Sequence, residues 1–396
     1  MGIGRFHPQT RLRLLFALAV LMTVTACTSF ETFTPLSPKL STEQVIDPAW
    51  IALLTSAPTP PVQEIVAYTD AYYDILSFHI SEDGRYLSYY LLDRFPGKEK
   101  GQVIQYDRTS NQQKMIWVDP NPTRLLRGPV ITWSPDGRTL SLENYEQFGV
   151  SDLRLVDLKS GSQTQCPTKA MFLGWNPFTG LPLFWNQSGK EARIVSTPVD
   201  RWAPSPLSPP FPGELPWRMN SLAIWAGQEC FFQRDASYSY KEVDEYWSFN
   251  FQTQIFSRMD GAPFSGHEDR LLIGTIEGKR EKWSEYDVDQ IWLKEGADTR
   301  LLFTRPPGSS FEDVIGWLNA DEFLFRISFN RDETALCVCR ILPRGVEVRK
   351  LYAWEPSEPV GQHYSFQLGP DQALWGLATP SFSNPARESI IHIPLP

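Results

Sequence analysis

Short apolar segments separated by tight turns recur along most of this chain. The clearest unit places an apolar strand around Trp133 ahead of the turn Ser134-Pro135-Asp136-Gly137, and a second strand follows directly. A third apolar stretch, residues 153–158, ends at another turn closed by Gly161. In such turns Pro presets φ at the first corner, Asp accepts a backbone N–H, and Gly takes the left-handed position. The pattern predicts small antiparallel sheets.

Six further units share this arrangement, spaced roughly 40 to 53 residues apart, which is the size of a four-stranded blade. One unit alone leaves both faces of its sheet exposed, so successive units must stack. We therefore predict an all-β fold, a β-propeller of four-stranded antiparallel blades over residues 62–396. Seven blades are expected, and six is the alternative. The seven strand–turn units begin at residues 78, 131, 173, 222, 264, 315 and 366.

The two ends of the repeat region complement each other. The seventh unit has three strands before Pro396, whereas a closed ring requires a fourth strand there. The apolar segment at residues 64–68, just before the first unit, can supply it. This N-terminal strand would close the ring and cover two exposed sheet edges at once.

Two of the units carry a recognisable motif. Ser134-Pro135-Asp136-Gly137 with the stretch at residues 155–161 resembles the WD40-like (PD40) repeat of TolB-type β-propellers. Ser81-Glu82-Asp83-Gly84 with Tyr106-Asp107 is a second match. The resemblance implies a propeller, commonly six-bladed in that family, and a partner that is another protein of the cell envelope. It carries over no catalytic residue.

The N-terminus is typical of an export signal. Arg5, Arg11 and Arg13 precede an apolar run at residues 14–24, and Cys27 follows small residues. This segment resembles the lipobox of bacterial lipoproteins, which implies a signal peptide at residues 1–26 and acylation of Cys27. An ordinary secretory peptide with an incidental cysteine is the alternative. Since Thr28 is not Asp, the family rule favours the outer membrane, facing the periplasm.

A stretch rich in Pro, Ser and Thr follows, and we interpret residues 27–61 as a tether. Within it, residues 48–54 are expected to form a short helix, because Asp47 can cap it and Pro48 suits the first helical position. The apolar side of this helix, including Trp50, would dock on the protein's own body or on a partner.

Charge and cysteine content limit the partners and metal sites that we expect. The net charge is −9, and removal of residues 1–26 takes away three arginines and no acid, which leaves about −12. Without a basic stripe, nucleic acid is not an expected partner. Cys337 and Cys339 alternate in an apolar strand and are interpreted as small buried side chains, with a metal or redox pair as the alternative.

Motifs for catalysis are missing from the sequence. There is no nucleophile elbow, zinc-protease helix, phosphate-binding loop or dinucleotide fingerprint, so we expect no cofactor, no metal and no catalytic residue. The cluster His267-Glu268-Asp269 could act as a base or a metal ligand, but it falls in an expected solvent-facing turn. His79 and His363 lie near innermost strands and are interpreted as structural.

Binding residues are expected in long loops opposite the turns that follow the first strands. Three such loops belong to successive blades and present aromatic side chains, which suit protein or glycan recognition. Alternatively, the rings cover the ends of the core. The predicted partner-binding residues are Trp202, Trp217, Tyr238, Tyr240, Trp283 and Tyr286.

These observations favour a non-enzymatic lipoprotein of the cell envelope whose propeller binds or scaffolds another protein. The anchor on Cys27 would hold it to the membrane without spanning the bilayer. Two alternatives stay open at this point. One is a glycan- or peptide-binding receptor, and the other is an envelope lyase or glycan-processing enzyme that uses the central channel.

Overall fold

The structure, a computed structural model, describes residues from Ser56 onward, with gaps. Residues 1–26, Cys27 and the expected helix at residues 48–54 lie outside the described part. The described ranges are 56–68, 72–95, 100–119, 130–146, 149–167, 170–188, 191–212, 223–234, 245–275, 288–329, 333–354, 366–378 and 388–396.

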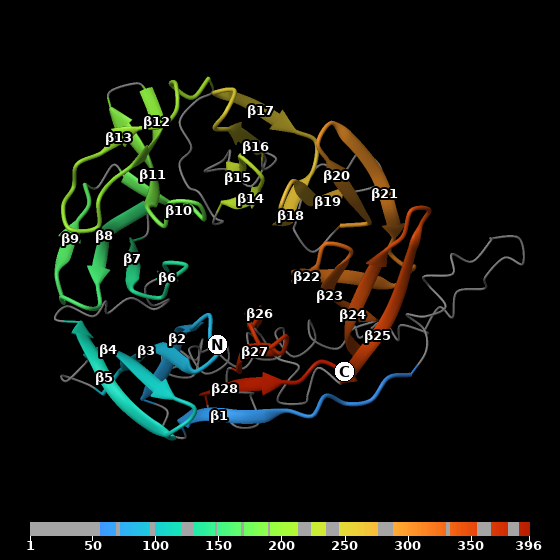
Figure 1. Cartoon of the computed structure of the whole chain (residues 1–396), viewed down its shortest axis with the longest axis horizontal. Coiled ribbons are helices and arrows are strands. Elements are labelled where there is room, and N and C mark those ends of the chain that lie inside the picture. The colour runs from blue at the N-terminus through green and yellow to red at the C-terminus, as the bar shows by residue number, and fades with distance from the viewer. Residues whose placement is uncertain are drawn as a thin grey trace, which may run out of the picture. The chain divides into compact units, whose positions relative to one another are not determined.

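Seven sheets of four antiparallel strands follow one another around a ring (Figure 1). The predicted all-β propeller is thus confirmed, with seven blades rather than six, and the described residues contain no helix. Blades 1 to 6 each use four consecutive strands, numbered from the innermost strand outwards. Blade 1 contains β2 (Tyr73–Ile80), β3 (Tyr86–Asp93), β4 (Lys100–Asp107) and β5 (Gln112–Asp119); blade 2 contains β6 (Val130–Trp133), β7 (Thr139–Glu146), β8 (Gly149–Asp157) and β9 (Gln163–Gln165); blade 3 contains β10 (Ala170–Trp175), β11 (Pro182–Ser188), β12 (Glu191–Ser196) and β13 (Ser205–Pro206).

The second half of the ring repeats this order. Blade 7 differs because it combines the last three strands of the chain with the first. Blade 4 contains β14 (Ile224–Ala226), β15 (Glu229–Arg234), β16 (Glu245–Asn250) and β17 (Ile255–Met259); blade 5 contains β18 (Ala262–His267), β19 (Arg270–Thr275), β20 (Gln290–Glu295) and β21 (Asp298–Thr304); blade 6 contains β22 (Ser309–Asn319), β23 (Glu322–Phe329), β24 (Glu333–Ile341) and β25 (Val346–Trp354); blade 7 contains β26 (Phe366–Leu368), β27 (Leu374–Ala378), β28 (Glu388–Ile393) and β1 (Gln63–Tyr68).

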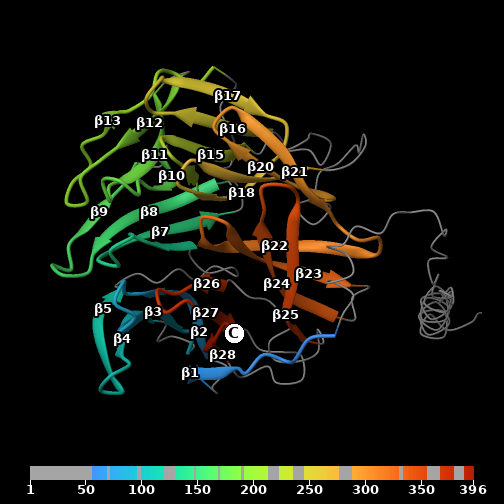
Figure 2. The same ribbon diagram turned by 45° about the vertical axis from the view of Figure 1, so that its right-hand side comes forward.

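Ring closure depends on β1, as the sequence predicts. β1 pairs antiparallel with β28, and Gln63 lies opposite His392 in the register. The segment before β1 also reaches blade 6, where the backbone N–H of Ala353 donates to the Pro58 carbonyl at 3.1 Å. Figures 1 and 2 show this blue segment approaching β25 before it becomes the outer strand of blade 7. The N-terminal segment therefore joins two blades.

The turns after the first strands satisfy their own hydrogen bonds. Ser134 Oγ donates to Asp136 Oδ1 at 2.7 Å, and the same Asp136 oxygen accepts from Arg138 N at 3.1 Å. Gly137 adopts φ of 66°, a left-handed conformation that a side chain would disfavour. The Ser81-to-Gly84 turn repeats this geometry, with Ser81 Oγ 2.6 Å from Asp83 Oδ1. The motif is therefore a rigid turn that does not rely on neighbouring blades.

The antiparallel strand order gives the ring two distinct ends. We call the end that carries the turns from first to second strand and from third to fourth strand the turn face. The opposite end, where second strands pass to third strands and one blade passes to the next, is the linker face. Every first strand runs from the linker face to the turn face.

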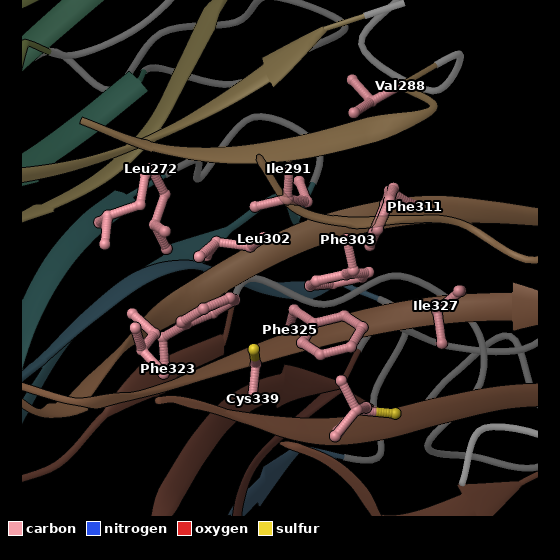
Figure 3. Packing of buried hydrophobic residues seen from close by; sticks show 14 of the residues in the cluster. Leu272, Val288, Ile291, Leu302, Phe303, Phe311, Phe323, Phe325, Ile327 and Cys339 are labelled. Atoms are coloured by element: carbon pink, nitrogen blue, oxygen red, sulfur yellow. The ribbon is translucent and has the colours of Figure 1, made fainter. Parts of the chain in front are cut away.

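Apolar side chains fill the spaces between blades. Each of the seven core clusters of described residues joins two consecutive blades. Figure 3 shows the cluster between blades 5 and 6, where Phe303, Phe311 and Phe325 pack against one another with ring centroids 5.4–5.8 Å apart. Cys339 lies in this cluster and is fully buried. Burial of this kind is the main contribution to stability.

One buried ion pair also links neighbouring blades. Arg154 of β8 lies 3.1 Å from Asp119 of β5, and their side chains are 6% and 1% exposed. Tyr90 donates to the same carboxylate at 2.9 Å. Burial, reinforced by the nearby Asp119 charge, raises the pKa of the Tyr90 phenol, so the hydroxyl stays a donor. The group fixes blade 1 against blade 2.

The role of β1 can be tested with two substitutions on opposite sides of one strand. Val66 is 4% exposed and packs in the cluster between blades 7 and 1, whereas its neighbour Ala67 is exposed. Val66→Asp should lower the free energy of unfolding by about 3 kcal/mol or more, because it buries a carboxylate without a partner.

Ala67→Asp serves as the matched control and should change the free energy of unfolding by less than about 0.5 kcal/mol. Urea titration followed by tryptophan fluorescence measures both variants. Equal effects of the two substitutions would show that β1 does not bury its inner side in the ring.

Candidate functional site

Of the six predicted partner-binding residues, the described part of the chain contains Trp202. It precedes β13 on the connection from the third to the fourth strand of blade 3, so it lies at the turn face. The expectation that it shares the opposite face with the other loops is wrong. The Trp202 ring is partly buried and packs edge-on against Phe184, with centroids 5.2 Å apart.

The other five predicted residues lie outside the described part. Tyr238 and Tyr240 fall between β15 and β16, Trp283 and Tyr286 fall between β19 and β20, and Trp217 falls between β13 and β14. The strand ends that flank these segments are all at the linker face of successive blades. The role of these residues in binding stays a prediction.

An exposed aromatic group occupies the turn face instead. Phe178, in the turn after the first strand of blade 3, is 60% exposed. Its ring meets Trp225 of blade 4 edge-on, with centroids 6.1 Å apart, and Trp225 in turn stacks on Phe251 at 5.3 Å. Leu181 at the end of the same turn is 40% exposed. We call Phe178, Leu181, Trp225 and Phe251 the aromatic platform.

Local hydrogen bonds fix the backbone of the turn that carries the exposed ring of the platform. Asn176 Oδ1 accepts from the backbone N–H groups of Phe178 and Thr179 at 2.9 and 3.1 Å. The Asn176 carbonyl accepts from Gly180 N at 2.8 Å. An aromatic anchor on a fixed backbone loses little entropy on binding. The sequence did contain a signal for this site, because Phe178 is a large apolar residue inside a polar turn motif.

Two histidines occupy related positions at other blade interfaces. The His79 ring of blade 1 stacks on Trp133 of blade 2 at 5.8 Å, and the His267 ring of blade 5 stacks on Trp317 of blade 6 at 5.7 Å. Burial lowers the pKa of His79, and the Asp136 carboxylate opposes this shift. These contacts give both histidines a packing role. His363 lies outside the described residues.

Acidic side chains on the first strands are matched with arginines of the second strands. Asp74 pairs with Arg94 near the linker face, and Asp313 pairs with Arg326 at 3.1 Å. Burial raises the pKa of both carboxyl groups, while the arginines act in the opposite direction. Within the described ranges, no three His, Cys, Asp or Glu side chains converge as metal binding requires.

The cysteines of the described part are free thiols in the protein interior. Cys337 and Cys339 are both fully buried in the cluster between blades 5 and 6, which confirms the expectation of small buried side chains. Burial raises the pKa of both thiols, so neither is an activated nucleophile. The described residues form no helix that is long and apolar enough to cross a membrane.

Comparisons with known proteins support the fold alone. No protein-family model matches the sequence, and no curated protein matches it. Among solved structures, the β-propeller domain of the Trilobed protease from Pyrococcus furiosus is 12% identical, with a TM-score of 0.51 over 81% of this chain and 95% of that chain. Prolyl oligopeptidase B from Galerina marginata is 10% identical, with a TM-score of 0.52 over 79% of this chain and 48% of that one. This chain therefore spans about half of the peptidase.

The expected TolB-type family is not established by these comparisons. TolB from Acinetobacter baumannii is 14% identical and covers 56% of this chain and 52% of its own, with a TM-score of 0.34. The protease propeller from Pyrococcus furiosus is described as having an open velcro topology. In this chain β1 pairs with β28. The class defined by the structure is a seven-bladed propeller.

The buried position of His79 predicts a pH dependence of stability. An imidazole whose pKa is lowered in the folded state binds its proton more readily when unfolded, where its pKa is about 6.5. Stability should therefore be highest above that value and fall as the pH decreases through and below 6.5. His79→Gln should flatten the pH dependence between pH 7 and 5.

Urea unfolding at a series of pH values measures this dependence. The difference between the wild-type and variant curves isolates His79, because all other titrating groups are common to both proteins. A constant difference across the pH range would contradict the interpretation.

Proposed function

We propose that the protein is a non-enzymatic, lipid-anchored propeller of the bacterial cell envelope that binds another envelope protein through its turn face. The observation that carries the binding role is the aromatic platform. Phe178 presents 60% of its surface to solvent although it is held against the rings of the next blade. Contacts of this type dominate the energetics of many protein interfaces.

Burial of Phe178 against a partner would release enough free energy for this residue to act as a binding anchor. Fully burying a Phe side chain contributes roughly 1.5–3 kcal/mol. The adjacent exposed Leu181 enlarges the apolar contact, and Trp225 supports the Phe178 ring from below. The turns of blade 2 on the same face carry exposed charged residues instead, including Lys159 and Asp136.

The envelope location rests on the N-terminal segment. A basic front, an apolar run and Cys27 after small residues form the pattern of a lipoprotein signal. The Pro-rich residues 27–61 would act as a spacer between the membrane and the ring. A propeller on such a spacer can reach a partner without entering the bilayer.

Site-specific photo-crosslinking in the native host tests the binding surface. A benzoylphenylalanine in place of Phe178 should give a discrete crosslinked product with one envelope protein. The same residue in place of Lys159, an exposed turn position of blade 2 on the same face, should not. A third placement, at Trp283, samples the predicted linker-face loops.

The pattern of crosslinking distinguishes a turn-face site from a linker-face site. Crosslinking from position 283 but not from 178 would place the site on the linker face and overturn the turn-face proposal. No product from either position would overturn the protein-binding role. Once the partner is identified, Phe178→Ala should weaken its affinity at least tenfold, while the melting temperature changes little because the ring is largely exposed.

Acylation is tested by metabolic labelling with radioactive palmitate. The wild-type protein should incorporate the label and fractionate with membranes. Cys27→Ala should abolish incorporation and leave the N-terminal segment uncleaved, because the thiol that accepts the lipid is missing. Equal labelling of both proteins would contradict the assignment of Cys27, and a soluble, unlabelled wild type would contradict the anchor.

A further inference from the structure

A pocket of about 490 Å³ opens between blades 6 and 7, away from the aromatic platform of blades 3 and 4. It lies at the turn face, where Asn319 ends β22 and Asp371 forms the turn after β26. Figures 1 and 2 show the C-terminus of the chain in this region, near β25 and β28. Pockets of this size enclose small organic ligands or short peptide segments.

The inner wall of the pocket is aliphatic. Val338 and Leu351 are 6% and 5% exposed and belong to the core between blades 6 and 7, and Leu318 and Leu395 pack against that core. A ligand side chain placed here would extend an existing apolar cluster. The wall therefore favours an aliphatic group.

Two acidic side chains line the pocket, together with Pro394 and Pro396, and both acids have partners. Asp371 accepts from Trp375 Nε1 at 3.2 Å and lies 3.2 Å from His392 Nε2 and 3.4 Å from Arg108. Although burial raises the pKa of Asp371, hydrogen bonds from Trp375 and Ala373 and the interaction with His392 keep it below its usual range. Glu322 accepts from Asn319 at 2.9 Å and faces Arg340 at 3.7 Å. Each acid therefore has a donor or cationic partner that offsets part of its negative charge.

The positive charge of Arg349 is not matched in this way. Arg349 lies opposite Val338 in the register, and both line the pocket with Leu351, which falls in the β-bulge between Lys350 and Tyr352. The guanidinium lines the pocket and is exposed, and no carboxylate of the described residues pairs with it. A guanidinium that has no carboxylate partner among the described residues, and lies beside an aliphatic wall, suits a carboxylate attached to an apolar group.

A second pocket residue is held in an unfavourable backbone conformation. Gln372 has φ of 55° and takes the position that Gly137 holds in the blade 2 turn, with its N–H donating to Gly369 O at 3.0 Å. Side chains disfavour this conformation. Glu268 in the blade 5 turn shares it, with φ of 52°, so strain alone identifies no site. Gln372, however, adds an amide donor to the pocket that holds Arg349.

We propose that this pocket binds the carboxyl end of a peptide chain, with Arg349 and Gln372 contacting the terminal carboxylate and the last side chain lying against Leu318, Val338 and Leu351. Capture of a chain terminus is an established mode of peptide recognition. The site is separate from the aromatic platform, so it stands whether or not Phe178 contacts a partner. A free aliphatic carboxylate shares this chemistry and is distinguished by the test.

The probe is a fluorescein-labelled Gly-Ser-Gly-Ala-Leu peptide with a free C-terminal carboxylate, titrated with the purified full chain and followed by anisotropy. The same peptide as a C-terminal amide should bind at least tenfold more weakly. Arg349→Gln should reduce affinity for the free acid at least tenfold. Arg344→Gln, an exposed position in the adjacent turn that does not line the pocket, should leave it unchanged.

The variant Gln372→Gly distinguishes an effect on peptide affinity from an effect on stability. The variant should melt on the order of 1–3 °C higher because the strain is relieved, yet bind the acid peptide several-fold more weakly. Glu268→Gly is the matched control and should raise the melting temperature without affecting binding.

Three results would overturn the proposal: equal binding of acid and amide, unchanged affinity of Arg349→Gln, or no binding of the acid peptide at millimolar concentration. N-acetyl-leucine that competes as strongly as the unlabelled peptide would assign the pocket to small carboxylates instead. Crosslinking from position 178 should persist in Arg349→Gln, so failure of this site and failure of the aromatic platform can be told apart.

Discussion

Face-to-face packing of neighbouring sheets is the constraint on which the rest of this molecule depends. Each described core cluster joins two consecutive blades, so every sheet buries both faces against different neighbours. A chain of such sheets leaves two apolar faces exposed until its ends meet. Closing the ring removes both, and β1 makes that closure by adding a chain end to the last blade.

The closure also determines the geometry of the pocket. Arg108 of blade 1 donates to the Gly84 carbonyl at 2.7 Å, lies over the Trp375 ring at 4.6 Å and reaches Asp371 of blade 7. Asp371 forms part of the pocket wall between blades 6 and 7. Contacts across the junction of blades 7 and 1 therefore orient groups that face a ligand at the next junction. Stability of the ring and shape of the pocket are coupled through one carboxylate.

The fold could be predicted from the sequence because its signals are local. Ser134 to Gly137 encode a turn that satisfies itself, and this geometry needs no tertiary contact to be recognised. Trp202 was placed on the wrong face because β13 has two residues, Ser205 and Pro206, which show no strand alternation. The pocket could not be predicted, since Arg349 and Gln372 belong to different blades and line one pocket only after the sheets have stacked.

The two residues that we propose as ligand or partner contacts lie in turns whose backbone groups already have hydrogen-bond partners. Asn176 holds the turn that presents Phe178, and the blade 7 turn keeps the hydrogen bond from residue 372 to Gly369 although Gln372 replaces the usual glycine. Phe178 contacts Trp225 of the next blade with only part of its ring and leaves 60% of its surface exposed. The side chain of Gln372 lines the pocket, although its backbone φ of 55° disfavours any side chain. Both residues are therefore the positions at which we propose that ligands or partners are contacted.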